Sequence, residues 1–244
     1  MSNDLILYCI VLFVVTVAGG LVTLIRQWSD EWLHLFLSFG AGVFLGAVFY
    51  YLLPEVMIQG SPNTAGLYVL IGYLLIFFFE RILIRSEGGH ANHGHMVVSI
   101  TALIGLSVHE LVEGIGLAIV VADKELARVL FLSIIAHKVP AAFSLVSLMV
   151  LAGQSRKKIW LNLIFFSAIG PFGTLVIGPI FGSGFADSLW QITGVVTGSF
   201  LYVATADLLP EVFHSRKRRW VNLFLMLVGI TLMSLVGATS EHHH

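Results

Sequence analysis

The stretch GVFLGAVFYYLLPEV, residues 42–56, is matched farther along the chain by GSFLYVATADLLPEV, residues 198–212. The two align without a gap, share Gly, Phe and Leu near their start, and end alike in Leu-Leu-Pro-Glu-Val. Apolar helices can resemble one another through composition alone, but that alternative does not readily produce a shared Pro-Glu pair. The two stretches therefore predict an internal repeat with a constant offset of 156 residues.

The composition predicts an integral membrane protein. Of the 244 residues 57% are hydrophobic and only 11% are charged, whereas about a quarter of the residues of a soluble domain are charged. A helix needs about 20 apolar residues to cross a bilayer. Eight segments of this kind occur, near residues 4–25, 33–55, 66–84, 97–121, 127–152, 158–182, 187–212 and 220–239. Because the connections are short, we predict a single all-α domain of eight transmembrane helices over residues 1–244, with the final EHHH read as part of an affinity tag.

The distribution of basic residues predicts the orientation. The even-numbered connections hold only Lys124 and Arg128, beside Asp123 and Glu125. The odd-numbered connections and their flanks hold ten basic residues: Arg26, Arg81, Arg85, Arg156, Lys157, Lys158, Arg216, Lys217, Arg218 and Arg219. By the positive-inside rule the odd connections, including loop 85–96, are cytoplasmic and both termini lie outside. A net charge of −1 gives no sign of nucleic-acid binding.

This orientation makes the two repeats opposite in topology. The second span ends at the outer surface with Glu55, and the seventh ends at the inner surface with Glu211. We therefore predict inverted repeats, spans one to three and six to eight, around a central pair of spans four and five. Inverted repeats are common in secondary transporters, whose sites lie near the middle of the membrane between the repeats.

The two central spans carry polar side chains within apolar runs. The fourth contains SVHELVEGIGLAIV, residues 107–120, and the fifth contains SIIAHKVPAAF, residues 133–143. An ionised side chain at the bilayer centre costs about 2.5–3.5 kcal/mol even on the mild insertion scale. These groups therefore need partners, and we expect them to find one another between the two helices.

The spacing of these residues predicts a metal site. His109 and Glu113 lie one helical turn apart on one face, and Glu110 points about 100° away. Imidazole nitrogens and carboxylate oxygens suit zinc and neighbouring divalent metals. We predict that His109, Glu113 and His137 bind the metal. Glu110 is either a further ligand or the partner of Lys138. A purely structural ion-pair cluster is the alternative, although such a pair needs no histidines.

A different class of function is also compatible with the fourth span. HELVE approaches the zinc-peptidase pattern, in which histidines at positions i and i+4 bind zinc and the intervening glutamate is the base. Here the fifth residue is Glu113 instead of histidine. An intramembrane zinc-dependent hydrolase is thus the alternative to a transporter, and we predict a protein that is not an enzyme.

Weaker patterns suggest a route to and from the site. Asp207, Glu211 and His214 share one helical face near the inner end of the seventh span. They form either a metal exit or a solvated patch beside the basic SRKRR. Glu55, at the outer end of the second span, either attracts cations at an entrance or is a simple loop residue.

The third connection contains a histidine-rich tract, GGHANHGH, at residues 88–95. Such tracts are typical of metal binding. His90, His93 and His95 are therefore candidates for metal capture on the cytoplasmic side.

These motifs together resemble the ZIP (Zrt-, Irt-like protein) family of divalent-metal transporters. The resemblance rests on HELVEG, HKVPAAF, and on GVFLG and FLYVA with their following LLPE, and it covers essentially the whole chain. It implies transport of zinc, or of iron, manganese or cadmium, into the cytoplasm across a cell membrane. It further implies an elevator-like motion of spans one, four, five and six, and a homodimer. His-Lys-x-Pro-Ala-Ala is similar to the branch typified by the ninth human ZIP.

The match to the family motifs is incomplete at one of two metal positions. His109, Glu113, Gly114, His137 and Pro140 match. The departures are Glu110 in place of Asn, Lys138 in place of an acid, and Ala141 in place of the last Glu. A lysine is a point charge that repels a nearby divalent ion. We therefore predict one bound metal ion, with the Lys138 ammonium standing in for the second.

Overall fold

The fold is described from a computed structural model of the chain. It describes residues 3–25, 28–78, 93–121, 124–181, 188–214 and 218–241. Within these ranges the chain forms helices and turns and no strand. The α-helices are α1 (Asn3–Ile25), α2 (Asp30–Ala47), α3 (Leu53–Gln59), α4 (Pro62–Phe78), α5 (His93–Val120), α6 (Lys124–Leu151), α7 (Arg156–Phe172), α8 (Gly178–Phe181), α9 (Leu189–Tyr202), α10 (Leu209–His214) and α11 (Arg219–Glu241). Three π-helical turns interrupt them: η1 (Val48–Leu52), η4 (Gly173–Ile177) and η6 (Val203–Leu208).

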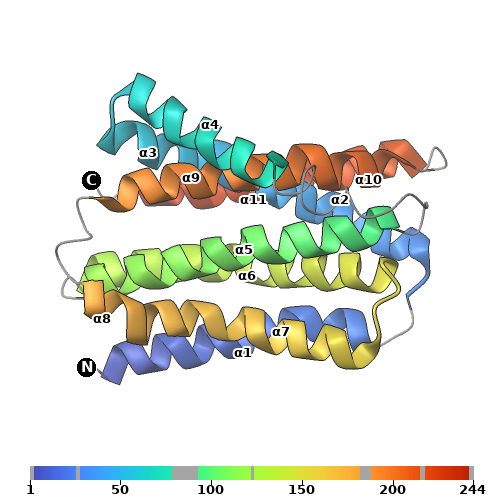
Figure 1. Ribbon diagram of the computed structural model, residues 1–244, viewed down its shortest axis with the longest axis horizontal. Helices are drawn as coiled ribbons and strands as arrows, with labels where there is room; N and C mark the ends of the chain where they lie inside the picture. The colour runs from blue at the N-terminus through green and yellow to red at the C-terminus, as the bar shows by residue number, and fades with distance from the viewer. Residues whose placement is uncertain are drawn as a thin grey trace.

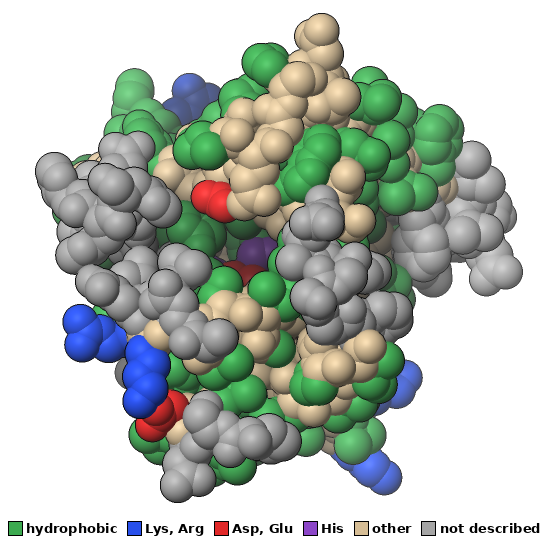
Figure 2. All heavy atoms as spheres, turned by 90° about the vertical axis from the view of Figure 1, so that its left-hand side faces the viewer, with side chains coloured by type: hydrophobic (Ala, Val, Ile, Leu, Met, Phe, Trp, Pro, Cys, Tyr) green, Lys and Arg blue, Asp and Glu red, His purple; other side chains and the backbone are tan. Residues whose placement is uncertain are grey.

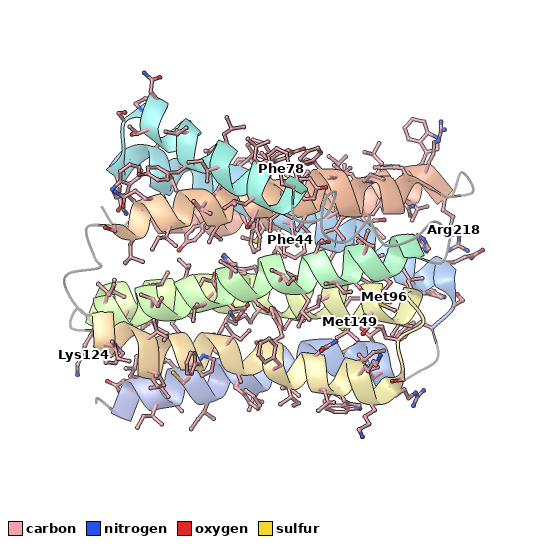
Figure 3. All side chains as sticks on the ribbon, in the orientation of Figure 1. Phe44, Phe78, Met96, Lys124, Met149 and Arg218 are labelled. Atoms are coloured by element: carbon pink, nitrogen blue, oxygen red, sulfur yellow. The ribbon has the colours of Figure 1, made fainter. Side chains whose placement is uncertain are left out.

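The helices form a bundle of two layers whose long axes run nearly parallel (Figure 1). One layer holds α1, α5, α6 and α7, and the other holds α2, α4, α9 and α11. Contacts of α2 with α6 and of α5 with α9 join the layers. Both labelled termini lie at the end of the bundle that also carries α3 and α8 (Figure 1). Lys124 lies at this end and Arg218 at the other (Figure 3).

Length and apolarity of the helices agree with a membrane protein. In the described ranges six helical runs are long and apolar enough to cross a bilayer: Asp4–Ile25, Glu31–Gln59, Met96–Val120, Leu130–Leu151, Arg156–Ile180 and Leu189–Ala206. Two shorter apolar helices, Pro62–Phe78 and Arg219–Leu235, accompany them. The predicted all-α membrane fold is thus confirmed. The count of eight spans stays a prediction, and the predicted third span, 66–84, extends beyond the described residues.

Each π-helical turn immediately precedes an X-Pro pair. The backbone N–H of Leu53 bonds to the carbonyl of Val48, and the next residue is Pro54. Leu209 bonds to the carbonyl of Ala204 in the same way, before Pro210. Proline has no N–H and its ring clashes with the carbonyl four residues back, and a wider turn relieves this conflict. The turns η1 and η6 occupy matching places in the two repeated stretches.

Glycines at matching places bring helices into close contact in the second layer. A Cβ on Gly42 of α2 would lie 2.0 Å from the carbonyl oxygen of Met226 on α11. A Cβ on Gly198 of α9 would lie 1.8 Å from the carbonyl oxygen of Val69 on α4. Membrane helices lack a hydrophobic drive to associate and pack through such small residues. The glycine that opens each repeated stretch therefore fixes a helix pair.

The contacts between helices are preserved when each helix of one predicted repeat is exchanged with its counterpart in the other repeat, and α5 is exchanged with α6. The helix pairs α2 with α11, α1 with α6 and α2 with α6 have counterparts in α9 with α4, α7 with α5 and α9 with α5. Exchanging α1 with α7, α2 with α9, α4 with α11 and α5 with α6 relates each pair to its counterpart. The stretches 42–56 and 198–212 run in opposite directions along the bundle (Figure 1). This arrangement favours the inverted repeat, which itself stays a prediction.

Candidate metal site

The polar residues of α5 and α6 meet in the middle of the bundle. The helices α5 and α6 lie antiparallel against each other. Their side chains face inward, so that only 3% of His109, 1% of Glu110 and 1% of Lys138 remains exposed. Buried charges in proteins are paired or bind metals. The buried residues of α5 and α6 include both an ion-pair group and a group of possible metal ligands.

Three donor groups converge on one point. Glu113 Oε1 lies 2.8 Å from His109 Nε2 and 2.7 Å from His137 Nε2. The two imidazole nitrogens are 3.4 Å apart. Two nitrogens bound to a tetrahedral zinc ion at about 2.0–2.1 Å are separated by about 3.4 Å. The histidines are thus spaced as ligands of one ion, and Glu113 Oε1 would need to move outward by about 0.5–0.7 Å.

The second oxygen of Glu113 belongs to a separate ion-pair group. Lys138 Nζ lies 3.0 Å from Glu113 Oε2 and 2.5 Å from Glu110 Oε2. The lysine therefore bridges two buried carboxylates. Glu110 pairs with Lys138. It does not belong to the group whose donor atoms converge, which consists of His109, Glu113 and His137. The sequence left its role open, and this geometry makes it the partner of Lys138.

Glycines of α5 and α7 let Glu110 lie against the neighbouring helix. A Cβ on Gly114 would lie 2.1 Å from the carbonyl oxygen of Gly170. A Cβ on Gly170 would lie 3.2 Å from Glu110 Oε2. Gly170 thus leaves space for the carboxylate that neutralises Lys138. Gly170 was not predicted from the sequence, although its position three residues before Gly173 in an apolar helix was a usable signal of close packing.

Replacing Gly114 by alanine should separate α5 from α7. Because the added Cβ would overlap backbone, we expect the free energy of unfolding to fall by about 1–3 kcal/mol, and zinc binding to weaken. Thermal unfolding in detergent micelles measures this. Gly116→Ala is the matched control, since its Cβ would meet nothing closer than 3.9 Å. Equal stability of the two variants would contradict the role of Gly114.

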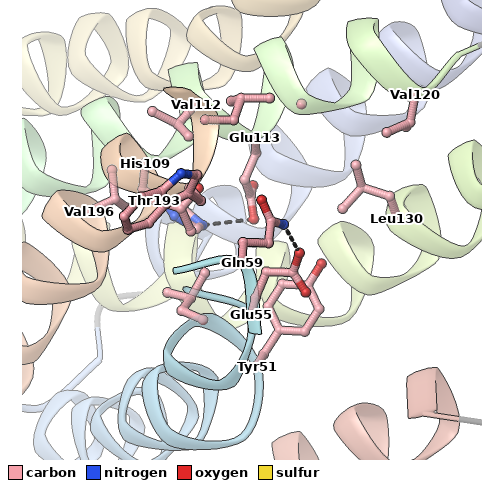
Figure 4. Close-up of a pocket in the computed structure, with 14 residues that line it drawn as sticks. Tyr51, Glu55, Gln59, His109, Val112, Glu113, Val120, Leu130, Thr193 and Val196 are labelled. Carbon is pink, nitrogen blue, oxygen red and sulfur yellow. Dashed lines mark hydrogen bonds and ion pairs between the residues drawn. The ribbon is translucent and has the colours of Figure 1, made fainter. Parts of the chain in front are cut away.

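A cavity of about 190 Å³ reaches the site from the end of the bundle that carries the termini. Figure 2 shows a hollow on this face with histidine and acidic side chains at its floor. His109 and Glu113 line the inner part, and the exposed Glu55 lies at the rim, where it accepts a hydrogen bond from Gln59 (Figure 4). Tyr51, Gln59 and Thr193 also line the cavity, and none of the three was predicted from the sequence.

Other predicted residues lie elsewhere or outside the description. Asp207, Glu211 and His214 belong to η6 and α10, at the opposite end of the bundle from the cavity, and their side chains lie outside the described residues. His90 lies outside them as well. His93 and His95 are the first turn of α5, again without described side chains.

One aromatic residue of the second layer contacts a metal-binding candidate directly. Phe200 of α9 packs on His109, with ring centroids 4.1 Å apart and an angle of 41° between the rings. From the sequence, Phe200 stood out only as a residue shared by the two repeated stretches, and no contact with the site was predicted for it. Its match to Phe44 was the signal that could have singled it out.

Comparison with known proteins identifies the family of the chain. The family profile described as ZIP zinc transporter matches residues 4–95 and 84–237. Zinc transporter ZIP9-B of Xenopus laevis is 27% identical over 252 residues, which cover 82% of this chain and 83% of that protein. Zinc transporter ZIP9 of Macaca fascicularis is 38% identical over 125 residues, 47% of this chain and 53% of that protein. Zinc transporter ZIP1 of Homo sapiens is 25% identical over 256 residues, 83% of this chain and 77% of that protein.

The matches cover both repeated stretches and the central helices α5 and α6. They confirm the resemblance to the family and to its ZIP9 branch. The hydrolase alternative is thereby set aside, because the relatives are transporters. The chain belongs to the ZIP zinc transporter family and is an integral membrane metal-ion transporter, not an enzyme.

Proposed function

We propose that the protein carries zinc into the cytoplasm through a site formed by His109, Glu113 and His137. The observation that carries this proposal is the convergence of three nitrogen and oxygen donors at the floor of a cavity. Relatives named zinc transporters support zinc as the cargo. Iron, manganese and cadmium share the ligand preferences that would admit them to the same site.

The site takes one ion. Glu110, Glu113 and Lys138 carry a net charge of about −1 when all are ionised, so one divalent ion brings the cluster to about +1 and a second to about +3. Lys138 Nζ lies between the two carboxylates, where a second ion would have to sit. A compact ammonium group cannot bind metal while protonated and repels a nearby cation.

The cavity opens to the outside of the cell membrane. Arg156, Lys157 and Lys158 begin α7, and Arg218 and Arg219 precede or begin α11, at the end of the bundle opposite the cavity. The positive-inside rule makes that end cytoplasmic, with both termini outside. By family likeness the protein is a homodimer in the cell membrane, and the metal gradient, the membrane potential or proton exchange drives it.

Transport proceeds by sliding of the layer α1, α5, α6 and α7 against the other layer. The central site lies on α5 and α6, so that such an elevator-like movement carries the ion with it. The repeat offset relates the cavity residues Tyr51 and Glu55 to Asp207 and Glu211. We therefore assign Glu55 to the entrance, and Asp207, Glu211 and His214 to the cytoplasmic exit. His90, His93 and His95 capture metal beside that exit.

Uptake by purified protein in proteoliposomes tests the proposal. We expect accumulation of zinc, compared in parallel with iron, manganese and cadmium, and loss of uptake in Glu113→Gln. Wild-type vesicles that accumulate none of the four metals, or a Glu113→Gln variant with unchanged uptake, would overturn the proposal.

Labelling of single cysteines tests the route. In a Cys9→Ser background, Thr193→Cys should react with an impermeant thiol reagent only from the cavity side, because Thr193 lines the cavity. Glu211→Cys should react only from the opposite side. Reaction of Glu211→Cys from the cavity side would contradict the assigned exit. The native Cys9 is buried. Wild-type protein treated with the same reagent therefore serves as the control and should not be labelled.

A further inference from the structure

Two phenylalanines at matching repeat positions meet next to the metal site. Phe44 of α2 and Phe200 of α9 contact each other edge to face, with ring centroids 5.3 Å apart and an interplanar angle of 70°. Both are buried, with 4% and 1% of their surface exposed. The offset of 156 residues relates one to the other. Figure 3 shows Phe44 between the two layers.

Within the described residues, Phe200 is the member of the pair whose ring contacts a metal-binding candidate. The ring of Phe200 packs on His109 of the other layer. On α9, Phe200 lies one turn beyond Val196, which lines the cavity. Phe44 and Phe200 belong to the largest apolar cluster, which also includes Leu106 and Val203. A hydrated divalent ion at His109 therefore meets an apolar wall if it moves away from the cavity.

The two layers also approach each other closely on the side of the site away from the cavity, between α2 and α6. A Cβ on Gly40 of α2 would lie 1.8 Å from Ser144 Oγ of α6. The offset of 156 residues relates Gly40 to Val196, which lines the open cavity between α9 and α5. The pair α2 and α6 is thus closely packed on the side away from the cavity, whereas the equivalent pair α9 and α5 is separated by the cavity on the other side. An alternating transporter exchanges these two conditions.

We propose that Phe44 and Phe200 are alternate barriers to the ion. Phe200, packed on His109, blocks the path to the cytoplasm in the state with an open outer cavity. We equate His109 with His137 under the exchange of α5 with α6, because each histidine begins the polar motif of its helix, HELVEG and HKVPAAF. In the opposite state Phe44 then packs on His137 and blocks the path to the outside. This inference rests on the proposed alternating-access transport and adds two residues that set its conformational equilibrium.

The two phenylalanines therefore stabilise opposite states. Phe44 and Phe200 lie in the same layer, so their mutual contact survives sliding, whereas the contact with a histidine exists in one state only. Loss of the Phe200 ring removes a contact of the outward-open state. Loss of the Phe44 ring removes the corresponding contact of the inward-open state. A purely structural role would instead make both substitutions act alike.

Two single-cysteine reporters measure the equilibrium. In the Cys9→Ser background, Thr193→Cys reports the outer cavity and Asp207→Cys reports the proposed exit. The measured quantity is the rate of labelling of the first from the cavity side divided by that of the second from the opposite side. We expect Phe200→Leu to lower this ratio about two- to tenfold and Phe44→Leu to raise it by a similar factor, the range for one aromatic contact.

Leucine keeps an apolar side chain at each position, so both variants should fold, and the alanine variants should shift the ratio in the same directions. The matched control is Phe166→Leu, because Phe166 is fully buried on α7, a helix that packs against α1, α5 and α6 of its own layer. Its ratio should stay at the wild-type value. Shifts of the same sign for Phe44→Leu and Phe200→Leu, or no shift in either, would overturn the proposal. Failure of wild-type zinc uptake would instead overturn the transport function on which it rests.

Discussion

Replacing His137 by alanine should lower zinc affinity about a hundredfold or more and abolish uptake. His137 Nε2 lies 2.7 Å from Glu113 Oε1 and 3.4 Å from His109 Nε2, so the substitution removes one of three converging donors. Loss of a group that only supports a metal ligand already costs about 10- to 100-fold in affinity. Loss of the ligand itself should cost at least as much. Equilibrium zinc binding in detergent and uptake in proteoliposomes measure the two effects.

His34→Ala is the matched control. His34 lies in the first turns of α2, away from the three converging residues. We expect its zinc affinity and uptake to stay near the wild-type values. The site would lie elsewhere if His137→Ala bound zinc with an affinity within about twofold of wild type while its helical content by circular dichroism was unchanged.

Replacing Lys138 by methionine should lower the free energy of unfolding of the metal-free protein by about 3–5 kcal/mol, which is the usual effect of removing one partner from a buried ion pair. The reason is that Glu110 and Glu113 would lose the only ammonium group between them in the described part of the chain. Burial of an unpaired carboxylate is far more costly than burial of a neutral group of the same shape. Unfolding by heat or denaturant in micelles measures the difference.

The double variant Glu110→Gln with Lys138→Met distinguishes the effect of an unpaired charge from the effect of a changed side-chain shape. It removes both members of the buried pair and should recover most of the lost stability, since replacing a whole buried pair is often neutral. Zinc should also stabilise Lys138→Met more than wild type, because the ion supplies the missing positive charge. Equal stability of Lys138→Met and wild type would contradict the role of the pair. Two zinc ions bound at the wild-type site would contradict the single-ion proposal.

Much of the fold follows from local features of the sequence. Apolar runs of helical length identify a membrane bundle because each helix must satisfy its own backbone in lipid. The shared ending Leu-Leu-Pro-Glu-Val predicts a repeat, and the structure adds matching π-helical turns before Pro54 and Pro210. These turns were not predicted. The missing N–H of each proline was a usable signal, although Pro140 lies within α6 with no such turn.

The candidate site was predictable as a set of residues but not as a geometry. His109, Glu113 and His137 stand out in the sequence because polar groups in an apolar span need partners. The sequence could not decide between Glu110 as a ligand and Glu110 as the partner of Lys138. That choice depends on how far each helix is rotated about its own axis. The rotation is set by contacts with a third helix, where Gly114 meets Gly170.

By itself the sequence determined the membrane class and predicted the repeat and the chemical identity of the candidate site, because these depend on composition and on spacing along single helices. Only the tertiary structure decided that Lys138 bridges two carboxylates, that Phe200 packs on His109, and that the cavity opens at the end with the termini. Each of these depends on the relative position of two helices or two layers. The same sequence is compatible with more than one such position, since sliding of packed layers changes no local pattern.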